Sequence, residues 1–168
     1  MRRQPTFPFV AAGIAILLAA CAPPPIYKPD AAVLAASPAQ VAAAPDRYRD
    51  GEVIWGGRIV GVRNFPDHSE IELLALPLDS SQRPRPDQPA AGRFIALVPG
   101  YVEAMDNPPG ALITVHGHLD GVRAGKVGDA AYSFPLVRAQ QSHRWTPEEM
   151  RKSRVSFGVG IGVIGGFH

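Results

Sequence analysis

Five short segments of β-forming residues, with turn residues between them, constrain what this chain can fold into. The segments are rich in Val, Ile and Leu, and Gly, Pro, Asp and Asn bound them. They cover residues 52–63, 69–78, 93–98, 112–119 and 132–140. In the second segment, Ile71, Leu73 and Ala75 share one side of a strand, opposite Glu70 and Glu72. Five short strands without a long helix predict a mainly β fold, a small five-stranded, OB-like β-barrel.

A short helix is predicted directly before the barrel. Ser37 can cap it, with Pro38 in its first turn and Gln40 placed to complete a capping box. The glycine pair at 56–57 falls inside the first strand, where a bulge or a sharp bend is expected. Helix and barrel together form one predicted domain, residues 37–145, which is long enough for one hydrophobic core.

Residues 1–20 have the layout of a bacterial lipoprotein signal peptide. A basic pair at 2–3 precedes an apolar run at 7–18, and small residues then lead to Cys21. The run is shorter than the about 20 apolar residues that a spanning helix needs. A cysteine at the cut predicts acylation, palmitate included, so that the mature chain starts at Cys21 and is held in a membrane by its lipid. Ala22, rather than aspartate, favours the outer membrane, with the domain facing the periplasm.

Two segments flank the predicted domain. Residues 21–36 hold four prolines between positions 23 and 29 and predict an extended tether, in which about fifteen residues reach on the order of 45 Å. Residues 146–168 form a Gly-rich tail, in which apolar and small residues alternate between 155 and 162. Three interpretations of the tail stay open: a disordered segment, a strand added to a sheet edge, or a contact with a membrane or partner.

Cysteine content and charge exclude several classes of protein. Cys21 is the only cysteine, so lipidation leaves no disulfide and no thiolate metal site. The chain has 17 basic and 15 acidic residues, and removal of residues 1–20 takes away two arginines and no acid. The mature chain is therefore neutral, and we expect no nucleic-acid partner, because binding phosphates requires a basic face.

Short motifs between residues 45 and 145 resemble the Slp family of outer membrane lipoproteins, and the cysteine-terminated signal agrees. The motifs recur in the family's order and spacing, while residues 103–111 depart from its pattern. They are Tyr48, Gly51, Trp55-Gly56-Gly57-Arg58-Ile59, Leu76-Pro77-Leu78-Asp79, Arg83-Pro84, Gly92-Arg93-Phe94, Gly100-Tyr101, Thr114-Val115-His116-Gly117, Tyr132, Pro135 and His143-Arg144-Trp145. The resemblance implies an outer membrane lipoprotein linked to starvation and stress responses of the envelope. It implies no catalytic residues.

Two histidines form a candidate metal or pH-sensing site. His116 and His118 lie two apart on one predicted strand, so both point to the same side, and Asp120 could add an oxygen ligand. The alternative is that this side is a solvated barrel face, since the opposite side carries the apolar residues. No HExxH motif accompanies the pair, and the sequence favours the solvated face.

Basic and aromatic residues form candidate binding elements. Arg83 and Arg85 alternate with prolines in an extended loop that could touch lipopolysaccharide phosphates or a partner groove. The alternative is a solvent-exposed loop kept open by proline. Trp55, Tyr101 and Trp145, together with two further tyrosines, could form a stacking platform for sugars or bases. The alternative, core and rim packing, is favoured for most of them.

Nothing in the sequence indicates catalysis. Glu70 and Glu72 share one side of a strand, but no apolar pocket is evident that would raise one pKa, so a solvated face is predicted. Ser80 and Ser81 lie in a Pro-rich loop without a nucleophile elbow. We therefore expect no enzyme activity and no cofactor beyond the lipid on Cys21.

The sequence favours a non-enzymatic envelope module. Anchored in the outer membrane, its barrel would bind another protein, peptidoglycan or lipopolysaccharide. The alternative is a periplasmic sensor of a ligand, a metal or pH that uses the face of His116 and His118.

Overall fold

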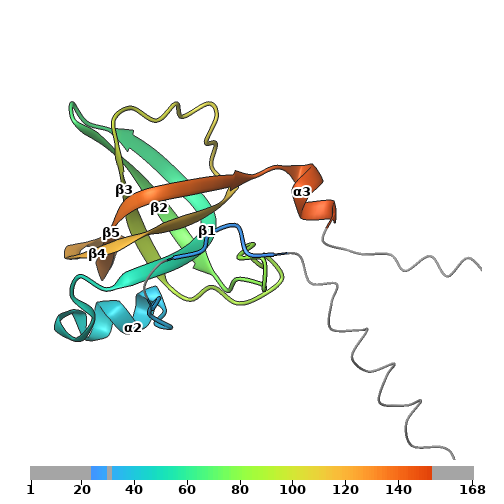
Figure 1. Ribbon diagram of the computed structural model, residues 1–168. Coiled ribbons are helices and arrows are strands. Elements are labelled where there is room, and N and C mark those ends of the chain that lie inside the picture. The colour runs from blue at the N-terminus through green and yellow to red at the C-terminus, as the bar shows by residue number, and fades with distance from the viewer. Residues whose placement is uncertain (1–23, 30–31, 153–168) are drawn as a thin grey trace, which may run out of the picture.

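Five strands close into a barrel in the order β1-β2-β3-β5-β4, and β4 pairs back with β1 (Figure 1). The computed structural model describes residues 24–29 and 32–152. The strands are β1 (Glu52–Asn64), β2 (His68–Leu76), β3 (Arg93–Pro99), β4 (Leu112–Val127) and β5 (Ala130–Trp145). All neighbouring strands are antiparallel except β3 and β5, which are parallel. This order is that of the OB-fold, so the predicted mainly β, five-stranded OB-like barrel is confirmed.

The barrel interior is filled by the apolar side of each strand. Ile71, Leu73 and Ala75 of β2 are at most 2 % exposed, as their alternation predicts. Phe94 of β3 and Val115 of β4 are completely buried among them. Burying each large side chain of this kind contributes about 1.5–3 kcal/mol, so the core can hold the fold without disulfides.

The predicted short helix is α2 (Pro38–Ala43), which a 3-10 turn, η2 (Pro45–Tyr48), follows. The Gln40 backbone N–H donates to Ser37 Oγ at 3.3 Å, and Ser37 N–H donates to Gln40 Oε1 at 2.8 Å, which completes the capping box. Val41 is 2 % exposed and joins the core cluster.

The break in the β1 ladder lies about three residues after the glycine pair at 56–57, where a bulge or bend was predicted. The pairing of β1 with β2 runs without a break through Gly56 and Gly57 and shifts between Ile59 and Gly61. The glycine pair instead permits close approach: a Cβ at Gly57 would lie 2.1 Å from the carbonyl oxygen of Leu74.

The hairpin of β4 and β5 is longer than the sequence predicts. The segments 112–119 and 132–140 were expected to end before a loop, but the ladder runs on from Val122–Pro135 to Val127–Ala130. Solvent-exposed residues dominate the added part, so no apolar alternation marks it. β2, conversely, ends at Leu76, before Pro77, which has no N–H to donate.

Both flanking segments are partly folded. The prediction of a Gly-rich tail from residue 146 is wrong for its start, because α3 (Pro147–Lys152) follows β5. Thr146 caps α3: its hydroxyl accepts from Glu149 N–H at 3.2 Å. The predicted signal peptide 1–20, Cys21 and residues 153–168 lie outside the described residues. Among the residues described, no helix has the length and apolar character needed to cross a membrane.

The predicted tether is docked on the barrel at Tyr27 and again between Leu34 and Ala36, so the expectation of a stretched linker is wrong at these residues. Tyr27 is 9 % exposed, and its backbone N–H and C=O bond the side-chain amide of Gln82 at 2.7 and 2.9 Å. Further along, Leu34 N–H donates to the Glu52 carbonyl at 2.8 Å. The Trp55 indole N–H donates to the carbonyl of Ala36 at 2.8 Å. Backbone groups that an extended linker would leave to water are thus paired with the domain.

Candidate functional site

The outer surface of β2 and β3 carries a cluster of charged side chains. Because Ile71 and Leu73 point into the core, the alternating positions His68, Glu70 and Glu72 point outward. In OB-folds this face, together with the loop after the first strand, binds oligonucleotides and oligosaccharides. We call it the arginine face, after its four arginines: Arg63 of β1, Arg93 of β3, Arg123 of β4 and Arg138 of β5.

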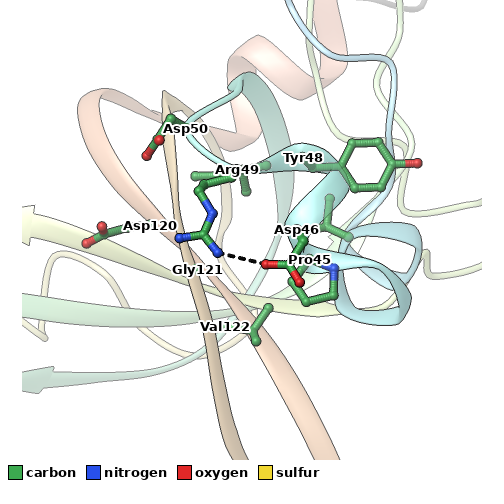
Figure 2. A pocket seen from close by; sticks show the side chains of 10 residues that line it. Pro45, Asp46, Tyr48, Arg49, Asp50, Asp120, Gly121 and Val122 are labelled. Carbon is green, nitrogen blue, oxygen red and sulfur yellow. Dashed lines mark hydrogen bonds and ion pairs between the residues drawn. The ribbon is translucent and has the colours of Figure 1, made fainter.

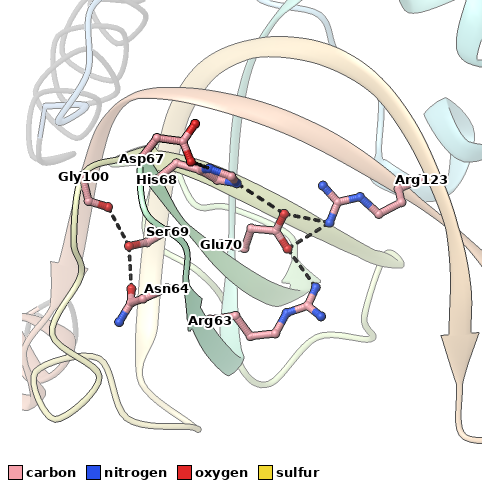
Figure 3. A network of polar contacts seen from close by, with 8 residues as sticks. All are labelled: Arg63, Asn64, Asp67, His68, Ser69, Glu70, Gly100 and Arg123. Carbon is pink, nitrogen blue, oxygen red and sulfur yellow. Dashed lines mark hydrogen bonds and ion pairs between the residues drawn. The ribbon is translucent and has the colours of Figure 1, made fainter.

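Glu70 is the centre of this cluster (Figure 3). Arg63 Nη2 lies 2.8 Å from Glu70 Oε2, and Arg123 Nη1 lies 2.7 Å from Glu70 Oε1. His68 Nε2 is 3.6 Å from the same Oε1, and the other ring nitrogen of His68 contacts Asp67 at 2.8 Å. The Glu70 side chain is 4 % exposed, whereas Arg63 and Arg123 are 67 % and 41 % exposed. One covered carboxylate thus positions two guanidinium groups whose remaining edges face solvent.

The ionisation of the cluster follows from these contacts. Burial alone would raise the pKa of the Glu70 carboxyl, but the hydrogen bonds and charges of Arg123 and Arg63 outweigh it, so the pKa is lowered. The hydrogen bond with Asp67 raises the pKa of His68, and the same contact lowers the pKa of Asp67. A carboxylate held ionised in this way has no proton to give at neutral pH, so Glu70 is not suited to be a general acid.

The structure corrects the prediction that both glutamates lie on a solvated face. Glu72 does: its side chain is 34 % exposed and bonds Arg93 at 2.7 Å. Glu70 does not, because Arg123 from the β4–β5 hairpin covers it from a position 53 residues away in the chain.

Two shallow depressions flank Glu70 on the arginine face. One, of about 240 Å³, is lined by Val60, Gly61, Val62, Arg63, Glu70, Glu72 and Ile95. The other, of about 260 Å³, is lined by Asp67, His68, Leu97, Val98, Pro99 and Arg138. Each combines aliphatic side chains with a guanidinium group. Such a surface can pack against the flat face of a sugar ring while the guanidinium bonds a carboxylate or phosphate on it.

A third depression lies between η2 and residues 119–122 of β4 (Figure 2). Its volume is about 350 Å³, and the carboxylates of Asp46, Asp50 and Asp120 stand apart around it. Arg49 bonds Asp46 at 2.7 Å, but both side chains are largely exposed. In the described part of the chain, no three His, Cys, Asp or Glu side chains are grouped so that they could hold a metal ion.

The predicted set of His116, His118 and Asp120 is not brought together. His116 Nε2 lies 2.5 Å from Glu52 Oε1, while Asp120 bonds Arg138 at 2.7 Å. His116 is only 8 % exposed, so the expectation of a solvated face is wrong for it: the Tyr27 ring covers it, with the ring centroids 5.6 Å apart. Burial also raises the pKa of the Tyr27 hydroxyl to about 12.

A polar groove of about 480 Å³ remains beside this covered pair. It is lined by Lys28, Pro29, Glu52, His116, His118, Gln140 and Gln141. His116 and His118 therefore still share one groove, although a separate contact withdraws Asp120 from them.

The two arginines of the candidate basic loop differ in burial. Arg83 is 8 % exposed, with its guanidinium carbon 5.1 Å from the centre of the Trp145 ring, so the prediction of an open basic loop is wrong for it. A turn causes this: the Asp79 carboxylate accepts the Ser81 and Arg83 backbone N–H groups and folds the loop back onto the barrel. Arg85 stays exposed and pairs with Asp87 at 3.4 Å.

The candidate aromatic residues do not form a common surface. Trp55 and Trp145 are each 6 % exposed, and the Trp145 indole N–H donates to Thr114 Oγ1 at 2.9 Å. Tyr101 is 71 % exposed and stands alone in the loop after β3. The packing interpretation is therefore confirmed for the two tryptophans.

The functional residues that sequence reasoning missed are Arg63, Asp67, His68 and Arg123, and on the other face Tyr27 and Gln82. A local signal existed for one pair, since Asp67-His68 forms a turn between two predicted strands. For Arg123 and Gln82 no local signal existed, because their partners lie 53 and 55 residues away.

The fold and its charged outer face define a small OB-type barrel protein, and comparison with known proteins gives its family. The model of the outer membrane lipoprotein Slp family matches residues 18–160, and the chain belongs to this family. The resemblance noted in the sequence and the outer membrane location that it implies are thereby confirmed. The family description names no catalytic activity.

Individual relatives agree with this assignment. The chain is 32 % identical to the uncharacterized lipoprotein YeaY of Escherichia coli K12 over 142 residues, which are 81 % of this chain and 70 % of the relative. It is 27 % identical to the outer membrane protein Slp of the same organism over 106 residues, 63 % and 56 % of the two chains. A protein of Haemophilus influenzae is 38 % identical over 92 residues, 54 % of this chain and 50 % of its own length. The matches thus span half to 70 % of the relatives' lengths.

One solved structure is similar in outline. It is a small single-stranded DNA-binding protein from Streptomyces coelicolor, with 10 % identity and a TM-score of 0.35, and the match covers 57 % of this chain and 94 % of that chain. A likeness this distant says nothing about what the present chain binds.

Proposed function

We propose that this chain is a lipid-anchored, non-enzymatic module of the outer membrane that faces the periplasm and binds an anionic glycan through its arginine face. The observation that carries the proposal is the arrangement around Glu70. A buried carboxylate holds Arg63 and Arg123 in place, and both side chains stay partly exposed on the face that OB-folds use for ligands. Arg63 lines one depression on this face, and Arg138 lines a second one.

The chemistry of the face favours sugars that carry carboxylate or phosphate groups, as peptidoglycan and lipopolysaccharide do. Arginine bonds such groups through two parallel N–H donors, and the aliphatic floor of Ile95 and Leu97 suits a sugar ring. The neutral charge of the mature chain argues against nucleic acid as the ligand.

Acylation of Cys21 supplies the anchor in this proposal, and no cofactor beyond that lipid is required. The support is the signal layout before Cys21 and its place inside the matched family region. Replacement Cys21→Ser is expected to abolish palmitate labelling in cells. Labelling that persists would refute the anchor.

Binding can be tested with variants that leave Glu70 paired. Arg138→Ala removes a guanidinium from one depression, and its side chain is 68 % exposed, so the fold should tolerate the change. Arg47→Ala is the matched control, because Arg47 is an exposed arginine of η2 and does not lie on the strands of the arginine face. We expect Arg138→Ala to weaken sedimentation with purified sacculi or with lipopolysaccharide several-fold, and Arg47→Ala to leave it unchanged.

The two ligand sources and a protein partner are separated by crosslinking in cells. A photoreactive residue at Leu97 on the arginine face is compared with one at Met105, which is 87 % exposed in the loop after β3. Adducts with muropeptides or with lipopolysaccharide at Leu97 alone identify the glycan. A single protein adduct at Leu97, with no glycan, would overturn the proposed ligand class.

A further inference from the structure

Tyr27 ties the start of the mature chain to one end of the barrel. Its backbone bonds the Gln82 amide twice, its hydroxyl lies 3.3 Å from the Thr114 carbonyl, and its ring covers His116. We call this end of the barrel, with Tyr27, Gln82, Thr114 and His116, the anchor end.

The distance between Cys21 and the anchor end is limited by chain length. Tyr27 follows Cys21 by six positions, and a fully extended chain spans at most about 3.6 Å per residue. The Cα atoms of these two residues are therefore within about 22 Å of each other. A stretched linker to residue 36 would allow about two and a half times that distance.

The β4–β5 turn lies at the opposite end of the barrel from the anchor end. Val127 at the β4–β5 turn follows His116 at the anchor end by eleven positions, a path of about 36 Å along β4, which is irregular between Leu119 and Val122. In Figure 1 the first described residues and α3 lie at one end of the barrel, and the β4–β5 turn lies at the other. Arg123 lies on the half of this hairpin that is nearer the turn.

The exposed residues beside Tyr27 suit a lipid surface. Tyr27 points inward, while its neighbours Ile26 and Lys28 are exposed. An apolar side chain beside a lysine is typical of a segment at the membrane interface, where lysine is attracted to anionic lipid headgroups. The polar groove with Lys28 and His118 opens on the same side.

From these contacts we infer that the anchor end is the membrane-facing surface of the protein, and that the Gln82–Tyr27 clamp orients the β4–β5 turn away from the bilayer. The partner of the anchor end is the lipid headgroup layer. This orientation rests on the proposed anchoring through Cys21. It would give a domain that is held by a flexible lipid a defined orientation relative to the membrane.

The test measures which end of the barrel approaches the bilayer. The mature chain is coupled through the Cys21 thiol to a maleimide phospholipid in vesicles of phosphatidylethanolamine and phosphatidylglycerol that contain a headgroup quencher. A fluorescent amino acid replaces either Gln140, which lines the groove at the anchor end, or Asp129, which is exposed at the β4–β5 turn. We expect quenching at position 140 to be at least twofold stronger than at position 129.

The clamp is tested with Gln82→Gly. Glycine accommodates the positive φ of 65° at this position but lacks the amide that holds Tyr27. Gln88→Gly, in the same loop, is the control. The twofold difference in quenching should shrink toward equality in Gln82→Gly and persist in Gln88→Gly.

Equal quenching at both positions of the wild-type protein, or stronger quenching at position 129, would overturn the inference. The same holds if Gln82→Gly leaves the difference intact. Chemical coupling at Cys21 separates this result from the anchor proposal: a failure of palmitate labelling in cells refutes acylation and leaves the measured orientation standing.

Discussion

The barrel covers two outward-pointing carboxylates, Glu70 on β2 and Glu52 on β1, and it covers them in different ways. Glu70 is shared by two arginines that remain partly exposed, so two guanidinium groups accompany one covered carboxylate. Glu52 meets the single ring of His116, and both side chains are only 10 % exposed beneath the docked Tyr27 segment. The first arrangement leaves hydrogen-bond donors open to a ligand, whereas the chain itself occupies the second.

The difference shows how one fold separates recognition from attachment. Both carboxylates stand at positions that strand alternation assigns to solvent, and in both a distant segment covers the carboxylate. On the arginine face this segment is a side chain whose remaining donors stay available. At the anchor end it is the Tyr27 ring, and the Gln82 amide already satisfies the backbone that carries this ring.

The largest expected effect comes from removing both arginines around Glu70. Arg63→Ala with Arg123→Ala removes both arginine partners of the Glu70 carboxylate and leaves only His68 at 3.6 Å, so we expect the free energy of unfolding to fall by about 3 kcal/mol. Urea denaturation at pH 7 measures it. Arg58→Ala with Arg138→Ala removes the same charge from exposed positions and should cost no more than about 0.5 kcal/mol. Equal costs for the two double variants would show that Glu70 is solvated.

At the anchor end, the corresponding change is Tyr27→Ala. Loss of the buried ring and its contact with His116 should lower the free energy of unfolding by about 2 kcal/mol, since the site lies at the edge of the core. Tyr101→Ala, at a residue that is 71 % exposed, is the control and should be nearly neutral in the same denaturation experiment. A neutral Tyr27→Ala would mean that the segment is not docked in solution.

A smaller effect is expected from Gln82→Gly, which removes two hydrogen bonds but no ring. The cost should be about 1 kcal/mol, because each net hydrogen bond contributes roughly that amount and glycine suits the backbone there. Hydrogen exchange of the Tyr27 backbone amide should accelerate, while Gln88→Gly should leave it unchanged. Unchanged protection of the Tyr27 amide in Gln82→Gly would contradict the clamp.

The smallest change concerns pH. The lowered pKa of Glu70 means that its contribution to stability is present above the ordinary value of 4.5 and is lost as pH falls through the folded-state pKa. Glu70→Gln lacks this contribution at every pH. The urea midpoints of wild type and variant should therefore differ at pH 7 and converge toward pH 3, whereas a constant difference would assign the effect to packing.

The sequence predicted the fold where local rules are sufficient. Alternation of Ile71, Leu73 and Ala75 located a strand and its buried side, and Ser37 with Gln40 located the helix start. Both rest on periodicity and capping within a few residues, which tertiary contacts reinforced here.

The sequence did not predict what covers the outer face of the barrel. Nothing near Glu70 or His116 signals that Arg123 or Tyr27 will lie over it, because those contacts depend on how the barrel closes. Burial of Arg83 against Trp145 had the same cause: the turn at Asp79 sets the direction of the loop. Separation along the chain, rather than residue chemistry, limited the prediction of the site.

The parallel pairing of β3 with β5 also bears on how the barrel assembles. This pairing joins only residues 95–97 to residues 136–138, whereas the β4–β5 hairpin is a long ladder closed by a tight turn. Local hairpins form early in folding, because bringing their strands together costs little chain entropy, and pairings between distant segments form late. Because it has only three residue pairs, the β3–β5 junction is expected to open before the longer ladders of the barrel. Transient opening there would separate Ile95 and Leu97 from β5 and expose the core beside the arginine face, so a ligand bridging both strands would slow unfolding of the whole barrel.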